Sequence, residues 1–129
     1  MTKRGPRCVL AGSVSFSRVT LERLLRHGAN VAGVLGLAES KSANVSDYAR
    51  LDDLAREHGV PYADFESINT AEVVETVRGW QPDLLFVVGL SQLVKEELLA
   101  IPRMGCIGFH PTHLPRGRGR APVAWLVHD

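Results

Sequence analysis

The chain has 129 residues, 45% of them hydrophobic, and its 15 Lys and Arg against 14 Asp and Glu leave a formal charge of +1. This is the size and composition of one small globular domain, and the near-neutral charge argues against a surface built to attract nucleic acid over long range. No apolar run reaches the roughly 20 residues of a membrane span, and residues 1–7 are polar with no signal-peptide core behind them, so we expect a cytoplasmic protein.

Short apolar runs alternate with amphipathic segments along most of the chain. The runs predict strands at "CVLAG" (8–12), "NVAGVLGL" (30–37), "VPYA" (60–63), "DLLFVVG" (83–89) and "GCIGFH" (105–110). The segments between them predict helices at "SRVTLERLLRHG" (17–28), "ARLDDLAREHG" (49–59), "NTAEVVETVRGW" (69–80) and "KEELLAIP" (95–102). Ser17 and Asn69 are placed to cap two of these helices, and Gly28 to end the first. Strands that are apolar throughout and separated by helices are typical of an α/β fold, here an open, Rossmann-like, mainly parallel sheet with helices on both faces.

Two further features are the end of the chain and the two cysteines. Pro122 is typical of a first helical turn, so "PVAWLVHD" (122–129) predicts the start of an apolar helix with no following element. We therefore expect residues 1–129 to form the incomplete N-terminal domain of a longer protein. Cys8 and Cys106 lie in apolar stretches and are predicted to be buried free thiols.

In an open parallel sheet, ligands bind beyond the carboxyl ends of the strands, which directs attention to three loops. The first loop, residues 12–17, lacks the G-x-G-x-x-G dinucleotide pattern. Two interpretations stay open for it: a plain turn with Phe16 against the sheet, or an anion-binding helix start. The second loop, residues 89–93, offers backbone amides and the Ser91 and Gln92 side chains, which suit a flat heterocycle with amide-like edges.

The third loop, residues 110–120, begins with a histidine at a strand end. There His110 is placed to act as a general base or a polarising group near neutral pH. Prolines stiffen the loop, and Gly117 and Gly119 permit tight turns. His113 and His110 form no convincing ligand set with Cys106, so no metal site is predicted.

The order "GCIGFHPTHLPRGRGRAPVAWLV" resembles the signature region of the folate-dependent formyltransferases, with its N-x-H element, its Leu-Leu-Pro and its R-G-x-x-P turn. The segments "VLAGSVSFSRVTLERLL" and "DLLFVVGLSQLVKEELLAIPRMG" also look like that family, so the resemblance covers nearly the whole chain. It implies a Rossmann-like sheet that binds N10-formyltetrahydrofolate, passes its formyl group to an amine and releases tetrahydrofolate.

The resemblance also implies roles for individual residues. His110 matches the catalytic histidine. The "GLSQLV" loop matches the part that receives the folate pterin, so Gly89, Leu90, Ser91 and Gln92 are candidate cofactor contacts. The candidate substrate contacts are Ser13, Phe16, Thr112, Arg116, Arg118 and Arg120.

Two departures from the family pattern affect the expected chemistry. Gly108 stands where the family has the asparagine of N-x-H and brings no donor for an oxyanion; one such donor is worth about 3 kcal/mol. Thr112, His113 or an ordered water are candidate substitutes. The family's catalytic aspartate lies farther downstream than Asp129, so we expect residues 1–129 alone not to turn over.

The acceptor amine is the least determined feature. The polar stretch "ESKSANVSDYARL" (39–51) has two basic and two acidic side chains, which is poor equipment for tRNA phosphates and looks more like the sugar N-formyltransferases. The amino group of a nucleotide-linked amino sugar is therefore the favoured acceptor, and methionyl-tRNA or another small amine is the alternative. The rival is a non-catalytic binding module, a truncated or degenerate formyltransferase-like domain that holds folate, a sugar nucleotide or a partner protein, and RNA binding through "RGRGR" ranks below both. The oligomeric state is left open, with a homodimer among the options.

Overall fold

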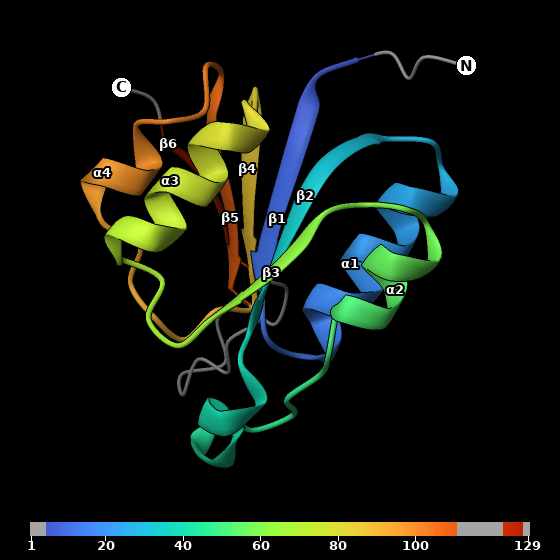
Figure 1. Cartoon of the computed structure of the whole chain (residues 1–129), viewed down its shortest axis with the longest axis vertical. Helices are drawn as coiled ribbons and strands as arrows, with labels where there is room; N and C mark the ends of the chain where they lie inside the picture. Colours follow the sequence, from blue (N-terminus) through green and yellow to red (C-terminus); the bar gives the residue numbers. More distant parts are fainter. Residues whose placement is uncertain (1–4, 111–122, 128–129) are drawn as a thin grey trace.

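The structure, a computed structural model, describes residues 5–110 and 123–127. The elements, in chain order, are β1 (Arg7–Gly12), α1 (Ser15–Arg26), β2 (Asn30–Leu37), the 3-10 helix η1 (Glu39–Asn44), α2 (Asp52–Glu57), β3 (Tyr62–Phe65), α3 (Ala71–Trp80), β4 (Leu84–Val88), α4 (Glu96–Leu99), β5 (Gly105–His110) and β6 (Val123–Val127) (Figure 1). Strands and helices alternate as the hydrophobic pattern predicts.

The strands form one six-stranded sheet in the order β3-β2-β1-β4-β5-β6. Strands β1 to β5 pair in parallel, and β6 pairs antiparallel with β5. Helices α1 and α2 cover one face of the sheet, and α3 and α4 cover the other (Figure 1). The predicted fold class, an open and mainly parallel α/β sheet with helices on both faces, is confirmed.

Alternate residues of the central strands supply the two halves of the core. On β1, Val9 and Ala11 belong to the cluster beneath α3 and α4, whereas Leu10 belongs to the cluster beneath α1 and α2. All three are at most 1% exposed, because β1 is flanked by strands on both sides and by helices on both faces. Continuous apolar runs therefore mark the buried strands.

Two helix starts differ from the sequence prediction. Helix α1 begins at Ser15 after Val14, so Ser17 lies inside the first turn and not at the cap. Helix α3 is capped by Thr70, whose hydroxyl accepts a hydrogen bond from the Val73 N–H, and Asn69 lies one residue before it. The predicted caps were polar residues near the correct ends, but their side chains are engaged with distant parts of the chain.

The end of the chain also differs from the prediction. Residues 123–127, "VAWLV", form strand β6 and not a helix. The run is short and rich in β-branched and aromatic residues, which favour strands, and periodicity alone does not separate helix from strand at this length. The free edge of β5 provides the backbone partners, with Gly108 opposite Trp125 in the register.

Two further expectations can be compared with the structure. Cys8 and Cys106 are buried and form no disulfide among the described residues, as predicted. Burial raises the pKa of the Cys8 thiol, and the negative charge of Asp83 adds to this effect. Within residues 5–110 and 123–127, no helix has the length and apolar character needed to cross a bilayer.

Gly33 on β2 lies beneath the Trp80 side chain at the end of α3. A Cβ at this position would overlap the indole ring, so the absence of a side chain lets the ring cover the strand. Gly79 is the natural comparison, because a Cβ added there would meet no atom within 4 Å.

We predict that Gly33→Ala lowers the free energy of unfolding by about 1–3 kcal/mol, because the indole must move. Gly79→Ala, in the helix that carries Trp80, is expected to raise it by about 0.5–1 kcal/mol through helix propensity. Urea unfolding of the two variants and the parent measures both effects. Equal stability of Gly33→Ala and the parent would contradict this packing.

Candidate functional site

The predicted loops meet where the sheet reverses its order. The chain leaves β1 toward β2 on one side and later places β4 on the other side of β1, so β1 and β4 border the topological switch point. Ser13 follows β1 and Gly89 follows β4. The buried Ser13 hydroxyl donates a hydrogen bond to the Gly89 carbonyl oxygen over 3.0 Å. Two of the predicted site residues are therefore in direct contact.

Ser17 strengthens this connection. Its hydroxyl oxygen accepts hydrogen bonds from the backbone N–H groups of Ser13, at 3.1 Å, and Val14, at 3.2 Å. The same hydroxyl donates to the Val88 carbonyl at the end of β4, and the side chain is fully buried. One side chain thus joins the β1–α1 turn to β4, and we call this set of bonds the Ser17 clasp.

Glycines make room for the Ser17 clasp on both strands. A Cβ at Gly12 would collide with the Ser17 side chain and the Val88 carbonyl oxygen. A Cβ at Gly89 would lie 2.8 Å from the Ser17 hydroxyl oxygen, and Gly89 has a φ of +64°, a conformation that other residues rarely adopt. The close approach of the two loops therefore depends on glycine at both positions.

The first loop is a plain turn. Ser17 already occupies the N–H groups of Ser13 and Val14, and the Ser15 N–H donates to the Asp47 carbonyl over 3.1 Å. The Ser15 hydroxyl donates to the Asp47 carboxylate over 2.8 Å, so a negative charge sits at the helix start. Phe16 is half-buried against the core beneath α1 and α2, as the plain-turn interpretation expects. An anion at this turn would have to displace these contacts.

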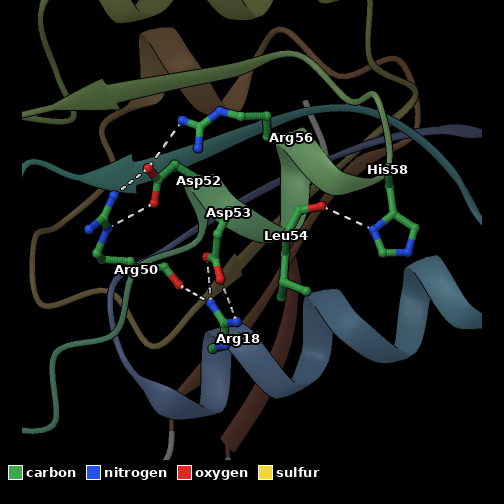
Figure 2. Close-up of polar contacts among 7 residues, drawn as sticks. All are labelled: Arg18, Arg50, Asp52, Asp53, Leu54, Arg56 and His58. Carbon is green, nitrogen blue, oxygen red and sulfur yellow. Dashed lines mark hydrogen bonds and ion pairs between the residues drawn. The ribbon is translucent and has the colours of Figure 1, made fainter.

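An ion-pair network anchors the segment that crosses this turn (Figure 2). Arg18 on α1 binds the Asp53 carboxylate through both terminal nitrogens, each at 2.7 Å, and also donates to the Arg50 carbonyl. Arg50 in turn binds Asp52, which Arg56 contacts from one helical turn farther along. The hydrogen bonds from Arg50 lower the pKa of Asp52 to about 2. One basic side chain of the 39–51 stretch is thus already neutralised.

The second loop presents unengaged backbone. Leu90 is 3% exposed and anchors the loop in the core. The backbone groups of Leu90 and Ser91 make no hydrogen bond with any other residue that the structure describes. The exposed Ser91 side chain is equally unengaged within the described chain, whereas both ends of the Gln92 carboxamide bind residues of the β3–α3 loop. The backbone at the exposed Ser91, and not the nearly covered backbone of Leu90 or the engaged Gln92 side chain, is therefore available to a ligand here.

The third segment begins beside the second loop. The Gly89 N–H donates to the Phe109 carbonyl over 3.1 Å, so His110, the last residue of β5, follows directly after this contact. Gly108 pairs with Val87 in the register of β4 and β5. The backbone of His110 therefore lies at the carboxyl edge next to the Gly89 loop. Four predicted substrate contacts, Thr112, Arg116, Arg118 and Arg120, lie outside the described residues, as does His113.

A separate cavity of about 800 Å³ opens beside β3 and α3. Asp64, Glu66 and Glu72 are among its lining residues, together with Ser40, Tyr62 and Thr70. None of the predicted site residues that the structure describes lines it, and its carboxylates would repel a phosphate or a carboxylate ligand. Within residues 5–110 and 123–127, no group of three or more His, Cys, Asp or Glu side chains is arranged to hold a metal ion.

We predict that Ser17→Ala lowers the free energy of unfolding by about 1–3 kcal/mol, because it leaves buried N–H and carbonyl groups without partners. Ser15→Ala, which removes only an exposed hydrogen bond to Asp47, should change it by less than about 0.5 kcal/mol. Denaturant titration of both variants is the measurement. Equal effects of the two substitutions would argue against the Ser17 clasp.

The depressed pKa of Asp52 predicts a pH dependence. The carboxylate stabilises the folded state at every pH above its unfolded pKa of about 3.9, and this contribution is lost as the pH falls toward the folded value of about 2. The stability difference between the parent and Asp52→Asn should therefore be constant near pH 7 and shrink between about pH 4 and pH 2. Unfolding midpoints across this range measure it, and a difference independent of pH would refute the assignment.

Comparison with known proteins adds sequence and structural relatives. Methionyl-tRNA formyltransferases from Geotalea uraniireducens and Thermotoga maritima are each 34% identical over 125 residues, which cover 95% of this chain and 40% of theirs. The chain thus spans about 40% of the length of these relatives. Their name matches the alternative acceptor of the sequence analysis and not the amino sugar that it favoured.

Solved structures support the fold. The glycinamide ribonucleotide transformylase 1 of Geobacillus kaustophilus superposes with a TM-score of 0.63 at 20% identity, over 91% of this chain and 64% of that one. The phosphoribosylglycinamide formyltransferase of Anaplasma phagocytophilum gives 0.62 at 22% identity, over 90% and 54%. At such identities the likeness concerns the fold alone. The formyl transferase family model matches residues 8–128, and this chain therefore belongs to the formyl transferase family.

Proposed function

We propose that this chain carries the formyl-donor half of an enzyme that transfers a formyl group from N10-formyltetrahydrofolate to a primary amine. The observation that carries the proposal is the juxtaposition at the switch point. A strand ending in His110 lies beside a loop in which the backbone groups of Leu90 and Ser91 make no hydrogen bond to any other described residue, in a chain of the formyl transferase family.

The residues of the second loop fit a folate. A pterin ring has a flat, amide-like edge, and the backbone of the exposed Ser91 offers both a donor and an acceptor to such an edge. Gly89 allows the loop to turn, and Leu90 fixes it in the core. When bound, N10-formyltetrahydrofolate supplies the formyl group. Of the four predicted cofactor contacts, Gln92 is better placed to brace the loop than to touch the ring.

His110 would act at the formyl oxygen and the attacking amine. Its imidazole can donate a hydrogen bond to an oxygen that gains negative charge as the amine attacks, or accept a proton from the amine. Gly108 supplies no side-chain donor, which removes about 3 kcal/mol of stabilisation unless another group replaces it. Because a partner carboxylate is expected downstream of this chain, residues 1–129 alone are proposed not to turn over.

Methionyl-tRNA becomes the better supported acceptor. The relatives described above, which match 95% of this chain, carry that name. The observation that keeps the amino-sugar nucleotide as the second candidate is the charge of residues 39–51. There Arg50 is paired with Asp52, and Asp47 lies at the start of α1, so this surface attracts phosphates weakly.

We predict that Ser91→Tyr abolishes binding of the stable analogue 10-formyl-5,8-dideazafolate, because the bulky ring would cover the peptide edges of the loop. The substitution is at an exposed position and should leave the fold intact. Glu57→Tyr, an exposed substitution at the end of α2 near the amino end of β3, is the matched control. Calorimetric titration measures both; equal binding by the two variants would place the folate elsewhere.

The acceptor is tested by binding. We predict that the chain retains methionyl-tRNA on filters more strongly than uncharged tRNA, because the free amino group contributes to recognition, and that N-acetylation of the methionine removes the difference. Calorimetry with a nucleotide-linked deoxyamino sugar provides the comparison. Saturable binding of the sugar without preference for charged tRNA would reverse the assignment of the acceptor.

A further inference from the structure

Gln92 connects the loop after β4 to the loop between β3 and α3. Its side-chain oxygen accepts a hydrogen bond from the Ile68 N–H over 2.7 Å, and its side-chain nitrogen donates to the Glu66 carbonyl over 2.8 Å. The carboxamide therefore bridges the backbone of the opposite loop as a neighbouring peptide group would. Both of its hydrogen-bonding ends are used.

Asn69 makes the reciprocal connection. Its side-chain nitrogen donates to the Leu93 carbonyl over 2.7 Å, and its side-chain oxygen accepts from the Lys95 N–H over 2.9 Å. Each loop thus contributes one carboxamide that binds two backbone groups of the other. We call these four hydrogen bonds the carboxamide bridge.

Apolar contacts anchor the two bridged loops. Ile68, Leu90 and Val94 are at most 8% exposed and belong to the core beneath α3 and α4. Leu90 and Val94 thus fix the two ends of the loop after β4, which we call the folate loop, while the carboxamide bridge holds the backbone around Gln92 and Leu93. Leu90 and Ser91 are left as the part of the loop whose peptide groups have no partner among the described residues.

We propose that Gln92 and Asn69 are positioning residues, which hold the exposed backbone of Ser91 in the geometry that a folate requires. This inference rests on the proposed function. A loop that must order itself on binding loses affinity through the entropy of ordering, and a loop already held in place avoids that loss. The carboxamide bridge orders the loop and leaves the backbone of Ser91 to the ligand.

The role differs from a general contribution to stability. The two Asn69 bonds and the bond from Gln92 to the Glu66 carbonyl are exposed, so water can replace them when the side chain is removed, and only the bond to the Ile68 N–H is partly buried. The buried anchors Ile68, Leu90 and Val94 remain in such variants. Removal of one carboxamide should therefore loosen the folate loop without unfolding the chain.

The test compares Gln92→Leu, Asn69→Ala and Asn69→Asp with the parent. The control is Asn44→Ala, which removes an exposed carboxamide at the end of η1. Calorimetric titration with 10-formyl-5,8-dideazafolate should show affinity reduced about tenfold by Gln92→Leu and by Asn69→Ala, the loss expected for hydrogen bonds that orient the loop. Asn69→Asp keeps the acceptor for the Lys95 N–H and should lose less, and Asn44→Ala should match the parent.

Backbone ¹⁵N relaxation provides a second readout. The order parameters of the Leu90 and Ser91 amides should fall in the two bridge variants, while those in the middle of β1 stay at the values of the parent. This pattern, together with the graded loss of affinity, supports the proposal. Variants that bind as tightly as the parent would overturn the positioning role of Gln92 and Asn69 but leave the proposed function standing. A folded parent that binds no analogue would overturn the proposed function and this inference with it.

Discussion

The geometry of the carboxyl edge depends on the buried hydroxyl of Ser17. Its oxygen accepts hydrogen bonds from two N–H groups of the β1–α1 turn, and it donates one to the Val88 carbonyl. It therefore fixes α1 relative to the ends of the adjacent strands β1 and β4. Gly12 and Gly89 leave space for it, and Ser13 adds a bond to the Gly89 carbonyl. The donors of the turn are thereby used within the turn, whereas the Leu90 and Ser91 backbone groups of the loop after β4 have no partner among the residues that the structure describes.

The loops at the carboxyl edge of the sheet have different roles. The β1–α1 turn is closed by Ser17 and by Asp47, and the Arg18, Arg50 and Asp52 network anchors the segment that covers it (Figure 2). The loop after β4 is held by buried Leu90 and by Gln92, and presents its backbone. Strand β5 brings His110 to the same edge. The proposed site for formyl transfer therefore combines the backbone of the loop after β4 with a strand-end histidine.

The sequence predicted the alternation of strands and helices because continuous apolar runs and amphipathic segments are local properties of the chain. It predicted a helix over residues 122–129, but residues 123–127 form a strand because the edge of β5 provides backbone partners, and such pairing is a tertiary contact. Ser17, Asn69 and Gln92 drew attention as polar residues near helix starts or loops. Ser17 has two local partners, but its bond to Val88 spans 71 residues and the Gln92 and Asn69 bonds to Ile68 and Leu93 each span 24, and no local pattern identifies such distant partners.

The most direct test of the proposed folate site is amide chemical-shift mapping of the ¹⁵N-labelled chain during titration with 10-formyl-5,8-dideazafolate. The largest shifts are expected at Leu90 and Ser91, with smaller changes at Gly89 and in the last residues of β5. Shifts confined to the cavity beside α3, around Asp64 and Glu72, would show that the ligand binds beside β3, away from the loop after β4, and would contradict the proposed folate site.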